Sequence, residues 1–461
     1  MTSEGVARPT TELRDTLDRL VASAQIDWKA PAVSAGVVVD GALLWSAHVG
    51  AAAVEPAEAP TDDTQYLIGS ITKTFTAVLV MALRDEGRLD LDEPVSSVLP
   101  QMSSRTLTPR RLLAHASGLG REFAGRIWES LDAPDEERLL RELADAEQVL
   151  PPHLAFHYSN LAYAALGQVV ARLDGGSWES SLHRRILGPL EMVHTGLQPG
   201  PTAATGYLVH PHAATAVPEP RLELRAAAPS GGLWSTVADM ARYASFVADP
   251  VAEVLAPASL EEMTHPVVMS DLDAWTGAYG MGFGLGRYGE RVLVGHGGAM
   301  PGFLSGLRVK RGDKVGAVVF ANSSAGAEPL DLAASLTLAV LDAQPTPQAP
   351  WTPSQPHPEL EGVLGTWWTE GAEIVFEVRQ DQLWSRVPAD PRPGGDTRFE
   401  PVEPDVFVAV QGRERGERLE VVRDASGGVA RMYFVGYPVT PEPVPSDSVS
   451  SGEIRPGAPR A

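Results

Sequence analysis

The amino-acid sequence predicts an α+β protein with a small all-β domain near its C-terminal end. Strand-like segments occur at both ends of the first 345 residues, and most of the residues between them have helical patterns. Farther along, a proline-dense segment precedes short runs of alternating apolar and polar residues that are separated by turns. With 461 residues, the chain is long enough for a large core and a second, smaller domain.

The chain begins with a predicted helix and a predicted β-hairpin. Residues 10–24 carry leucine and valine at helical spacing, which predicts an amphipathic helix. Residues 32–50 form two β-rich runs joined by an Asp-Gly pair at positions 40–41, a strong signal for a hairpin turn. An apolar helix is expected to begin near Ser70, and Gly87 is its stop signal.

The following segments complete the larger domain. Residues 106–200 are expected to be mostly helical. Glycine-rich strands are predicted over 279–298 and 306–324, and a last helix over 330–343. One antiparallel sheet could use strands from both ends of this domain, with the helical region inserted between them.

Four regions follow from these patterns. Residues 1–345 are expected to form the larger domain, and residues 346–358 a proline-rich, semi-rigid linker. Residues 359–440 alternate like the strands of a barrel or sandwich. Residues 441–461 are rich in proline, serine and glycine, which predicts a disordered tail.

Charge and composition limit the partners of the protein. The formal net charge of −22 argues against nucleic acid or an anionic membrane as a partner, because both would be repelled. The absence of cysteine excludes disulfides and thiol chemistry. The N-terminus lacks a basic segment followed by an apolar one, and no run approaches the roughly 18 apolar residues that span a bilayer. We therefore expect a soluble cytoplasmic protein without a membrane partner.

A single lysine interrupts the apolar helix. Lys73 is the one charged residue between Thr64 and Leu83, and burial of an unpaired ammonium is costly and lowers its pKa. Ser70 lies three residues earlier, so the two side chains are neighbours on one helix face. A serine hydroxyl is a poor nucleophile until a base takes its proton, and a buried lysine could be that base. An ordinary lysine that reaches the surface or a carboxylate is the alternative interpretation.

Two further segments carry residues suited to catalysis. Tyr158 precedes a predicted helix, and Asn160, one of only two asparagines in the chain, follows two residues later. His296 and the glycines at 297 and 298 follow a strand-like run, where glycine marks the close approach of a ligand or of backbone. Each of these segments alone also fits a structural role, such as a core tyrosine, a capping residue or a core histidine.

Together, the three motifs resemble those of the serine β-lactamase and penicillin-binding superfamily. They are Ser70-Ile71-Thr72-Lys73, Tyr158-Ser159-Asn160 and His296-Gly297-Gly298. The most similar branch contains class C β-lactamases, D-alanyl-D-alanine carboxypeptidases, D-aminopeptidases and family VIII esterases. Supporting stretches are LLAHASGLG (112–120), PSGGLWSTVADMARY (229–243) and YGMGFGLG (279–286), and the similarity covers roughly residues 10–343.

The resemblance implies a β-lactamase-like fold and a role for each motif residue. Ser70 would be the acylated nucleophile, and Lys73 and Tyr158 would transfer protons, with the first base left open between them. Asn160 would bind substrate and help to hold Lys73. The backbone N–H groups of Ser70 and Ala299 would form the oxyanion hole. The expected protein is a serine hydrolase that acts on a small amide, a D-amino-acid peptide or an ester, without cofactor or metal.

One residue departs from the pattern of most members. His296 occupies the position of a lysine whose charge meets the substrate carboxylate, and a histidine is mostly neutral near pH 7. Strong β-lactamase activity is therefore less expected, although a β-lactamase or a D-alanyl-D-alanine carboxypeptidase remains the alternative. A catalytically silent binding protein of the same fold is the non-enzymatic alternative.

The C-terminal domain and the other enzyme classes complete the predictions. Some relatives carry lipocalin-like barrels after the catalytic part, and GTWWTEGAEIVFEVRQDQLW resembles the start of such a module. The role of this domain is open between a stabilising appendage and a lid.

Other enzyme classes are disfavoured by the sequence. The chain lacks the G-x-S-x-G motif of α/β-hydrolases and the H-E-x-x-H motif of metalloproteases. Its glycine-rich GMGFGLG run lies among strands, which disfavours nucleotide binding. The expected partner is a small acyl substrate.

Overall fold

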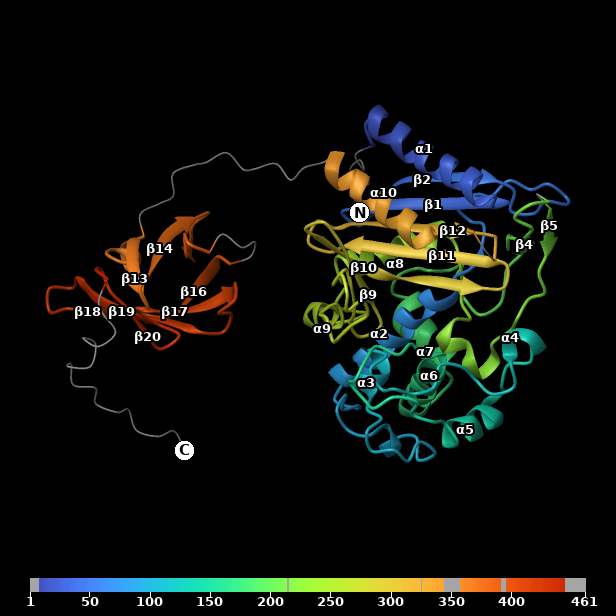
Figure 1. The fold of residues 1–461 in the computed structure, drawn as a ribbon, viewed down its shortest axis with the longest axis horizontal. Coiled ribbons are helices and arrows are strands. Elements are labelled where there is room, and N and C mark those ends of the chain that lie inside the picture. Colours follow the sequence, from blue (N-terminus) through green and yellow to red (C-terminus); the bar gives the residue numbers. More distant parts are fainter. Residues whose placement is uncertain (1–7, 214, 325, 344–356, 391–394, 444–461) are drawn as a thin grey trace. The chain divides into compact units, whose positions relative to one another are not determined.

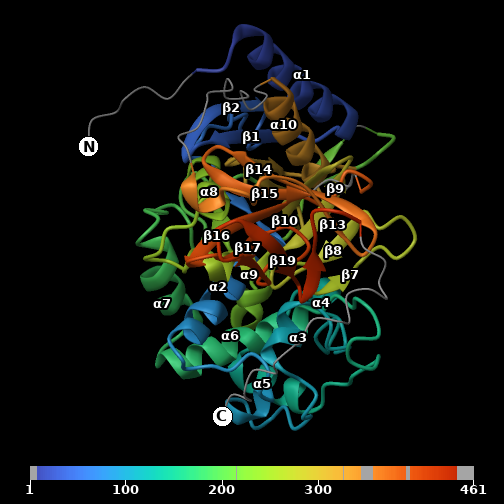
Figure 2. The same ribbon diagram turned by 90° about the vertical axis from the view of Figure 1, so that its left-hand side faces the viewer.

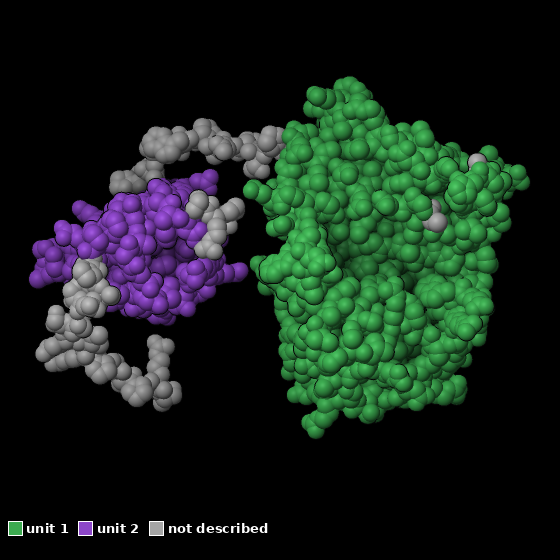
Figure 3. Space-filling model, in the orientation of Figure 1, with its two compact units in different colours: residues 1–346 green, residues 347–461 purple. Residues whose placement is uncertain are grey.

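The chain divides into two compact units, residues 1–346 and 347–461 (Figures 1 and 3). The computed structural model describes residues 8–213, 215–324, 326–343, 357–390 and 395–443. Each unit has its own hydrophobic core, and the N-terminal unit has two, one on each face of its sheet. The predicted α+β fold with a separate all-β unit is confirmed.

In the described residues, the N-terminal unit contains one antiparallel sheet of eight strands in the order β2-β1-β12-β11-β10-β9-β8-β7. The strands are β1 (Ala32–Val39), β2 (Ala42–Gly50), β7 (Val268–Met269), β8 (Gly277–Tyr279), β9 (Gly284–Tyr288), β10 (Arg291–Met300), β11 (Phe303–Lys310) and β12 (Val315–Ala321). Val33 of β1 lies opposite Ala321 of β12. The N-terminal hairpin and the C-terminal strands therefore share one sheet, as predicted.

Helices cover both faces of this sheet (Figures 1 and 2). The helices α1 (Thr11–Trp28) and α10 (Pro329–Ala343) pack on one face, and α8 (Val237–Ala248) packs on the other. Successive residues of a strand point to opposite faces. Val37 therefore packs in the core beneath α1 and α10, and Val38 packs in the core on the α8 side. The central strands are buried on both sides, which explains why their sequence is almost continuously apolar.

The helical region lies between β2 and β7 in the chain and forms the lower half of the unit in Figure 1. Helix α2 runs through it, and every residue from Ile71 to Leu83 is buried. The elements are η1 (Gly69–Ile71), α2 (Thr72–Asp85), η2 (Val95–Ser97), α3 (Pro109–Leu113), α4 (Ile127–Ser130), α5 (Glu136–Ala144), α6 (Asn160–Asp174), α7 (Trp178–Leu182), a π-helical turn η3 (His183–Leu187), η4 (Arg225–Ser230) and α9 (Pro257–Met263).

Two short strand pairs belong to the same unit. They are β3 (Tyr66–Leu67) with β6 (Trp234–Ser235) and β4 (Tyr207–Val209) with β5 (Ala216–Pro218). Residues 106–200 are less helical than predicted, because irregular segments occupy 114–126, 145–159 and 188–200. In the first and third of these segments, apolar residues such as Leu119 and Met192 are buried by tertiary contacts rather than on the face of a helix.

The C-terminal unit is an eight-stranded antiparallel meander within its described residues. After a turn η5 (Pro358–Leu360), its strands are β13 (Gly365–Thr369), β14 (Ala372–Arg379), β15 (Gln382–Arg386), β16 (Thr397–Glu403), β17 (Val406–Gln411), β18 (Arg418–Arg423), β19 (Val429–Phe434) and β20 (Tyr437–Val439). Trp368 and Thr440 exchange two backbone hydrogen bonds of 2.8 and 2.9 Å, which join the first strand to the end of the last. The sheet is therefore barrel-like rather than a sandwich.

The predicted linker and tail are mostly outside the described residues. Of the linker expected over 346–358, residues up to 356 are not described, and Pro358 begins the turn η5. Residues 444–461 of the expected tail are also outside the description. Among the described helices, none combines the length and apolar character that a bilayer crossing requires.

Strand β10 and turn η1 approach each other closely at two glycines. A Cβ atom on Gly298 would lie 2.0 Å from the carbonyl oxygen of Ile68, and one on Gly69 would lie 2.6 Å from the amide nitrogen of Ala299. The hydroxyl of Ser305 donates a 2.8 Å hydrogen bond to the same Ile68 carbonyl and fastens β11 to this junction. Only glycine at residue 298 permits this contact between strand and turn.

Replacement of Gly298 by alanine should therefore destabilise the N-terminal unit. We expect Gly298→Ala to lower the free energy of unfolding by about 2 kcal/mol or more, because backbone must move to admit the methyl group. Gly297→Ala is a matched control, since its Cβ would meet its nearest neighbour, Leu330, at an ordinary 3.5 Å and should cost less than about 1 kcal/mol. Urea-unfolding curves measure both differences, and equal costs would contradict the tight junction.

Candidate active site

Ser70 and Lys73 lie at the start of the buried helix α2. Ser70 occupies the 3₁₀ turn η1 and is partly exposed, whereas Lys73, in the first turn of α2, is fully buried. Their side chains meet, with 3.1 Å between Lys73 Nζ and Ser70 Oγ. The neighbouring positions expected from the sequence are therefore observed, although Ser70 belongs to the 3₁₀ turn rather than to the α-helix.

The amine of Lys73 has two further partners. Its Nζ lies 2.7 Å from Asn160 Oδ1 and 2.5 Å from the backbone carbonyl of Ser230, at the end of η4. Burial lowers the pKa of Lys73 well below its usual value. The charge of Glu122 opposes this shift and that of Arg121 adds to it.

The partners of Lys73 match the hydrogen-bonding capacity of a neutral amine. A carbonyl oxygen can only accept, so Asn160 Oδ1 and the Ser230 carbonyl take two hydrogens from the nitrogen. A neutral –NH₂ then has one lone pair left, and the remaining neighbour is the hydroxyl of Ser70. In this arrangement the nitrogen can accept the proton of Ser70.

Glu122 fixes the orientation of the Asn160 amide. Both carboxylate oxygens of Glu122 accept hydrogen bonds from Asn160 Nδ2, at 2.9 and 3.0 Å. Because the NH₂ group is held there, the oxygen of the amide must face Lys73. Ser159 caps helix α6 by accepting from the Ala162 amide at 3.0 Å, which places Asn160 in the first turn.

Tyr158 lies on the other side of Lys73. The centre of its ring is 4.8 Å from Lys73 Nζ, and the ring also packs 4.3 Å from His115 and 5.0 Å from the guanidinium of Arg121. Burial raises the pKa of Tyr158, while the nearby hydroxyl of Ser70 acts in the opposite direction. No hydrogen bond of acceptable geometry joins the two hydroxyls, and Tyr158 Oη is a buried group without a partner among the described residues.

His115 packs against the ring of Tyr158 and binds the backbone next to it. Its Nδ1 accepts a 3.1 Å hydrogen bond from the backbone N–H of Ser159, next to Tyr158. Burial lowers the pKa of His115 well below its usual value, so the ring is neutral. The LLAHASGLG stretch therefore holds the tyrosine loop in place.

The third motif forms the edge of the site. His296 Nδ1 lies 2.5 Å from the carbonyl of Gly297, so this nitrogen carries the hydrogen, and Nε2 is buried without a partner among the described residues. Burial lowers the pKa of His296 to about 3, which keeps the ring neutral. Strand β9 pairs with β10 only as far as Gly295, so His296 to Met300 lack a strand on that edge in the described part of the chain.

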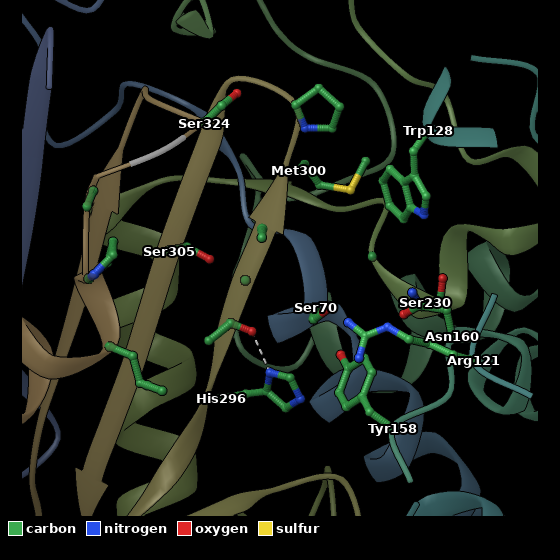
Figure 4. Close-up of a pocket in the computed structure, with 18 of the residues that line it drawn as sticks. Ser70, Arg121, Trp128, Tyr158, Asn160, Ser230, His296, Met300, Ser305 and Ser324 are labelled. Atoms are coloured by element: carbon green, nitrogen blue, oxygen red, sulfur yellow. Dashed lines mark hydrogen bonds between the residues drawn. The ribbon is translucent and has the colours of Figure 1, made fainter. Parts of the chain in front are cut away.

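These groups converge on one cavity of about 900 Å³ (Figure 4). Figure 4 shows Tyr158 and His296 on either side of the space next to Ser70, and the surface is hollowed between the sheet and the helical region (Figure 3). The residues predicted as site residues that line the cavity are Ser70, Tyr158, Asn160, His296, Gly297, Gly298 and Ala299, and Lys73 lies behind Ser70. All predicted site residues are therefore brought together.

The sequence did not reveal several residues that complete the site. Glu122, Ser230 and His115 each contact a motif residue from a segment distant in the chain. The stretches 112–120 and 229–243 resemble segments of related proteins, but this resemblance does not assign a role to any single residue in them. Ser230 acts through a backbone carbonyl, which no side-chain pattern can reveal.

A second set of residues has the identities of a serine hydrolase triad. His48 lies 3.0 Å from Ser34 Oγ and 2.9 Å from Asp62 Oδ1. However, Ser34 is completely buried, and its hydroxyl also bonds to Tyr66 at 2.8 Å. A substrate cannot reach this serine, so the arrangement ties β1 and β2 to the loop before α2.

Comparisons with known proteins found a family match for each unit. The model of the family described as Beta-lactamase matches residues 17–342, and a domain of unknown function (DUF7586) matches residues 356–440. Penicillin-binding protein 4 from Amycolatopsis lactamdurans is 32% identical over 366 residues, which cover 74% of this chain and 94% of that protein.

Solved structures share the fold. The octameric penicillin-binding protein homologue from Pyrococcus abyssi is 23% identical, with a TM-score of 0.64 over 92% of this chain and 99% of its own. The D-amino acid amidase from Ochrobactrum anthropi SV3, complexed with L-phenylalanine amide, is 23% identical, with a TM-score of 0.63 over 72% of this chain and 100% of its own. With the family match over most of the N-terminal unit, this chain belongs to the β-lactamase family, within the serine β-lactamase and penicillin-binding superfamily.

Proposed function

We propose that the protein is a serine hydrolase that forms an acyl-enzyme on Ser70. The observation that carries this proposal is the fully buried amine of Lys73, 3.1 Å from Ser70 Oγ, with its two other neighbours restricted to accepting hydrogen bonds. A base with a lowered pKa in contact with a serine hydroxyl is the arrangement that activates a serine nucleophile. No cofactor or metal has a part in this chemistry.

Acylation uses the groups in a fixed order. Lys73 takes the proton of Ser70 as Oγ bonds to the substrate carbonyl carbon, and the developing oxyanion is held by the backbone N–H groups of Ser70 and Ala299. In other acyl-transfer enzymes one such donor contributes about 2.7–4 kcal/mol. Tyr158, which burial keeps protonated, donates its proton to the leaving amine or alkoxide and regains one from the Lys73 ammonium.

Deacylation reverses the proton path. Water attacks the acyl carbon, its proton passes to the Lys73–Tyr158 pair, and the carbon–Oγ bond breaks as Ser70 Oγ receives a proton. The lowered pKa of Lys73 and the raised pKa of Tyr158 favour lysine as the first base and tyrosine as the proton donor. The two groups lie close enough to titrate as a pair.

The cavity favours small amides, D-amino-acid peptides or esters. Its volume of about 900 Å³ suits a small molecule, and Trp128, Phe156 and Met300 give it apolar walls. The neutral His296 supplies no cation beside the nucleophile, which disfavours strong β-lactamase or carboxypeptidase activity. A D-amino acid amidase with the same fold supports an amide substrate.

Covalent capture tests the nucleophile. Incubation with a p-nitrophenyl ester should add the mass of the acyl group to the intact protein, and Ser70→Ala should abolish both this adduct and ester turnover. Ser34→Ala is the matched control, because that serine is buried in the other Ser-His-Asp arrangement and should leave acylation unchanged. A silent binding protein would give no adduct with any acyl donor, and its Ser70→Ala variant would behave like wild type.

The dependence of activity on pH tests Lys73 as the base. If neutral Lys73 is required, kcat/KM rises with pH as the lysine loses its proton. The charge of Glu122 raises the pKa of Lys73, so Glu122→Gln should lower that pKa and move the rising limb to lower pH. The glutamine can still accept a hydrogen bond from Asn160, so the geometry is retained.

The ion-paired acid Glu142 provides a control for this shift. It is paired with Arg138, away from Lys73, and Glu142→Gln should leave the limb where it is. A limb that moves to higher pH in Glu122→Gln, or stays in place, would argue against lysine as the titrating base.

A further inference from the structure

A second cavity, of about 340 Å³, lies next to the catalytic cleft. Strands β8 and β9 form most of its wall, and Arg308 of β11 lines it as well. Phe156 lines both this cavity and the catalytic one. Tyr279 separates them, with its ring 5.4 Å from Phe156 and 5.8 Å from His296. The two cavities therefore lie next to each other at Phe156.

Arg308 crosses the sheet to reach this cavity. It lies opposite Gly295 of β10, which in turn lies opposite Gly284 of β9. Its Nη1 donates a long 3.4 Å hydrogen bond to the Gly284 carbonyl. A Cβ atom on Gly286 would lie 3.1 Å from Nη2, so the absence of a side chain there leaves the space in which the guanidinium lies.

The charge of Arg308 is buried without an ion pair. The residue is 8% exposed, and Nε is buried without a hydrogen-bond partner. Among the described residues, no carboxylate lies within ion-pair distance of it, although the charge of Asp331 acts on it from farther away. The ring of Tyr288, 5.8 Å from Cζ, is its one close aromatic neighbour in the same part of the chain. A guanidinium does not lose its proton in a protein, so it cannot escape the cost of burial by becoming neutral.

A buried cation that lacks an ion pair is the complement of an anionic ligand. Burial of a charge destabilises a fold unless a partner offsets the loss of hydration. The planar guanidinium presents paired N–H donors that fit a carboxylate. The neutral His296, by contrast, offers no charge to a substrate anion.

We propose that Arg308 binds a carboxylate of the substrate, on a chain that extends from Ser70 past His296 and Phe156 into the second cavity. This inference rests on the proposed hydrolase and makes its substrate an acid with a free carboxylate distant from the scissile bond. Arg308 is a binding residue for this specificity and takes no part in proton transfer.

Matched esters test the specificity. The p-nitrophenyl half-esters of dicarboxylic acids of increasing chain length are compared with p-nitrophenyl esters of monocarboxylic acids of equal length. Wild type should favour the half-ester by about tenfold or more in kcat/KM at one chain length. Arg308→Met should remove this preference while changing kcat/KM for neutral esters by less than about twofold. Its melting temperature should be unchanged or higher, because a buried charge is lost.

Two further variants make the result specific. Arg308→Gln provides a second neutral variant in case the methionine packs poorly. Arg287→Met removes a charge that also lines the cavity but is exposed, and it should keep the preference. Three outcomes would overturn the proposal. The preference for the half-ester could survive in both Arg308 variants, or Arg287→Met could lose it equally. It could also be absent from wild type at every chain length.

A binding measurement separates this proposal from the hydrolase itself. In Ser70→Ala the same esters should bind without cleavage, and calorimetry should show the half-ester binding about tenfold more tightly than its neutral partner. Ser70→Ala/Arg308→Met should bind both equally. If wild type cleaves no ester but this binding difference is present, the proposed hydrolase is wrong and the anion site stands. If esters are cleaved without any difference, the anion site is wrong and the hydrolase stands.

Discussion

The burial of one amine determines the organisation of this site. Lys73 is enclosed by α2, α6 and η4, and it is held there by two oxygens that can only accept hydrogen bonds. Loss of hydration favours the neutral amine, and Ser70 is the neighbour left for its lone pair. The contacting segments come from different parts of the chain, so this arrangement exists only when α2, α6 and η4 pack together within the helical region.

The charges around the amine limit how far its pKa falls. Glu122 raises the pKa of Lys73 through its charge and also fixes the Asn160 amide by two hydrogen bonds. Arg121, adjacent in sequence, pairs with Glu122 at 3.2 Å and lies over the ring of Tyr158. One acidic and one basic residue thus bring opposing fields to the same pair of proton-transfer groups, and the proximity of both to the solvent-accessible cavity moderates their effect.

Much of this arrangement could be predicted from the sequence, because its signals are local. The charge in the apolar helix marked Lys73, and the Asp-Gly turn indicated the hairpin in which Val39 of β1 pairs with Ala42 of β2. The partners of these residues could not be predicted in the same way. Glu122 lies 38 residues from Asn160 in the chain, and Ser230 contributes a carbonyl. The sequence of β11 gives no sign that Arg308 differs from an arginine that faces solvent. Its burial becomes visible only when β9 and β10 are paired and their glycines lie next to its side chain.

The neutral histidine follows from the same electrostatics. A permanent cation at residue 296 would be buried close to Lys73, and each positive charge would lower the pKa of the other. With a neutral ring there, the ammonium that forms on Lys73 in the proposed acylation meets no second cation from His296. The fixed positive charge of Arg308 lies on the adjacent strand β11, opposite Gly295, and it too lowers the pKa of His296. In the proposed reaction, the charge that recognises the substrate, on Arg308, thus belongs to a different residue from the amine that changes its charge, on Lys73.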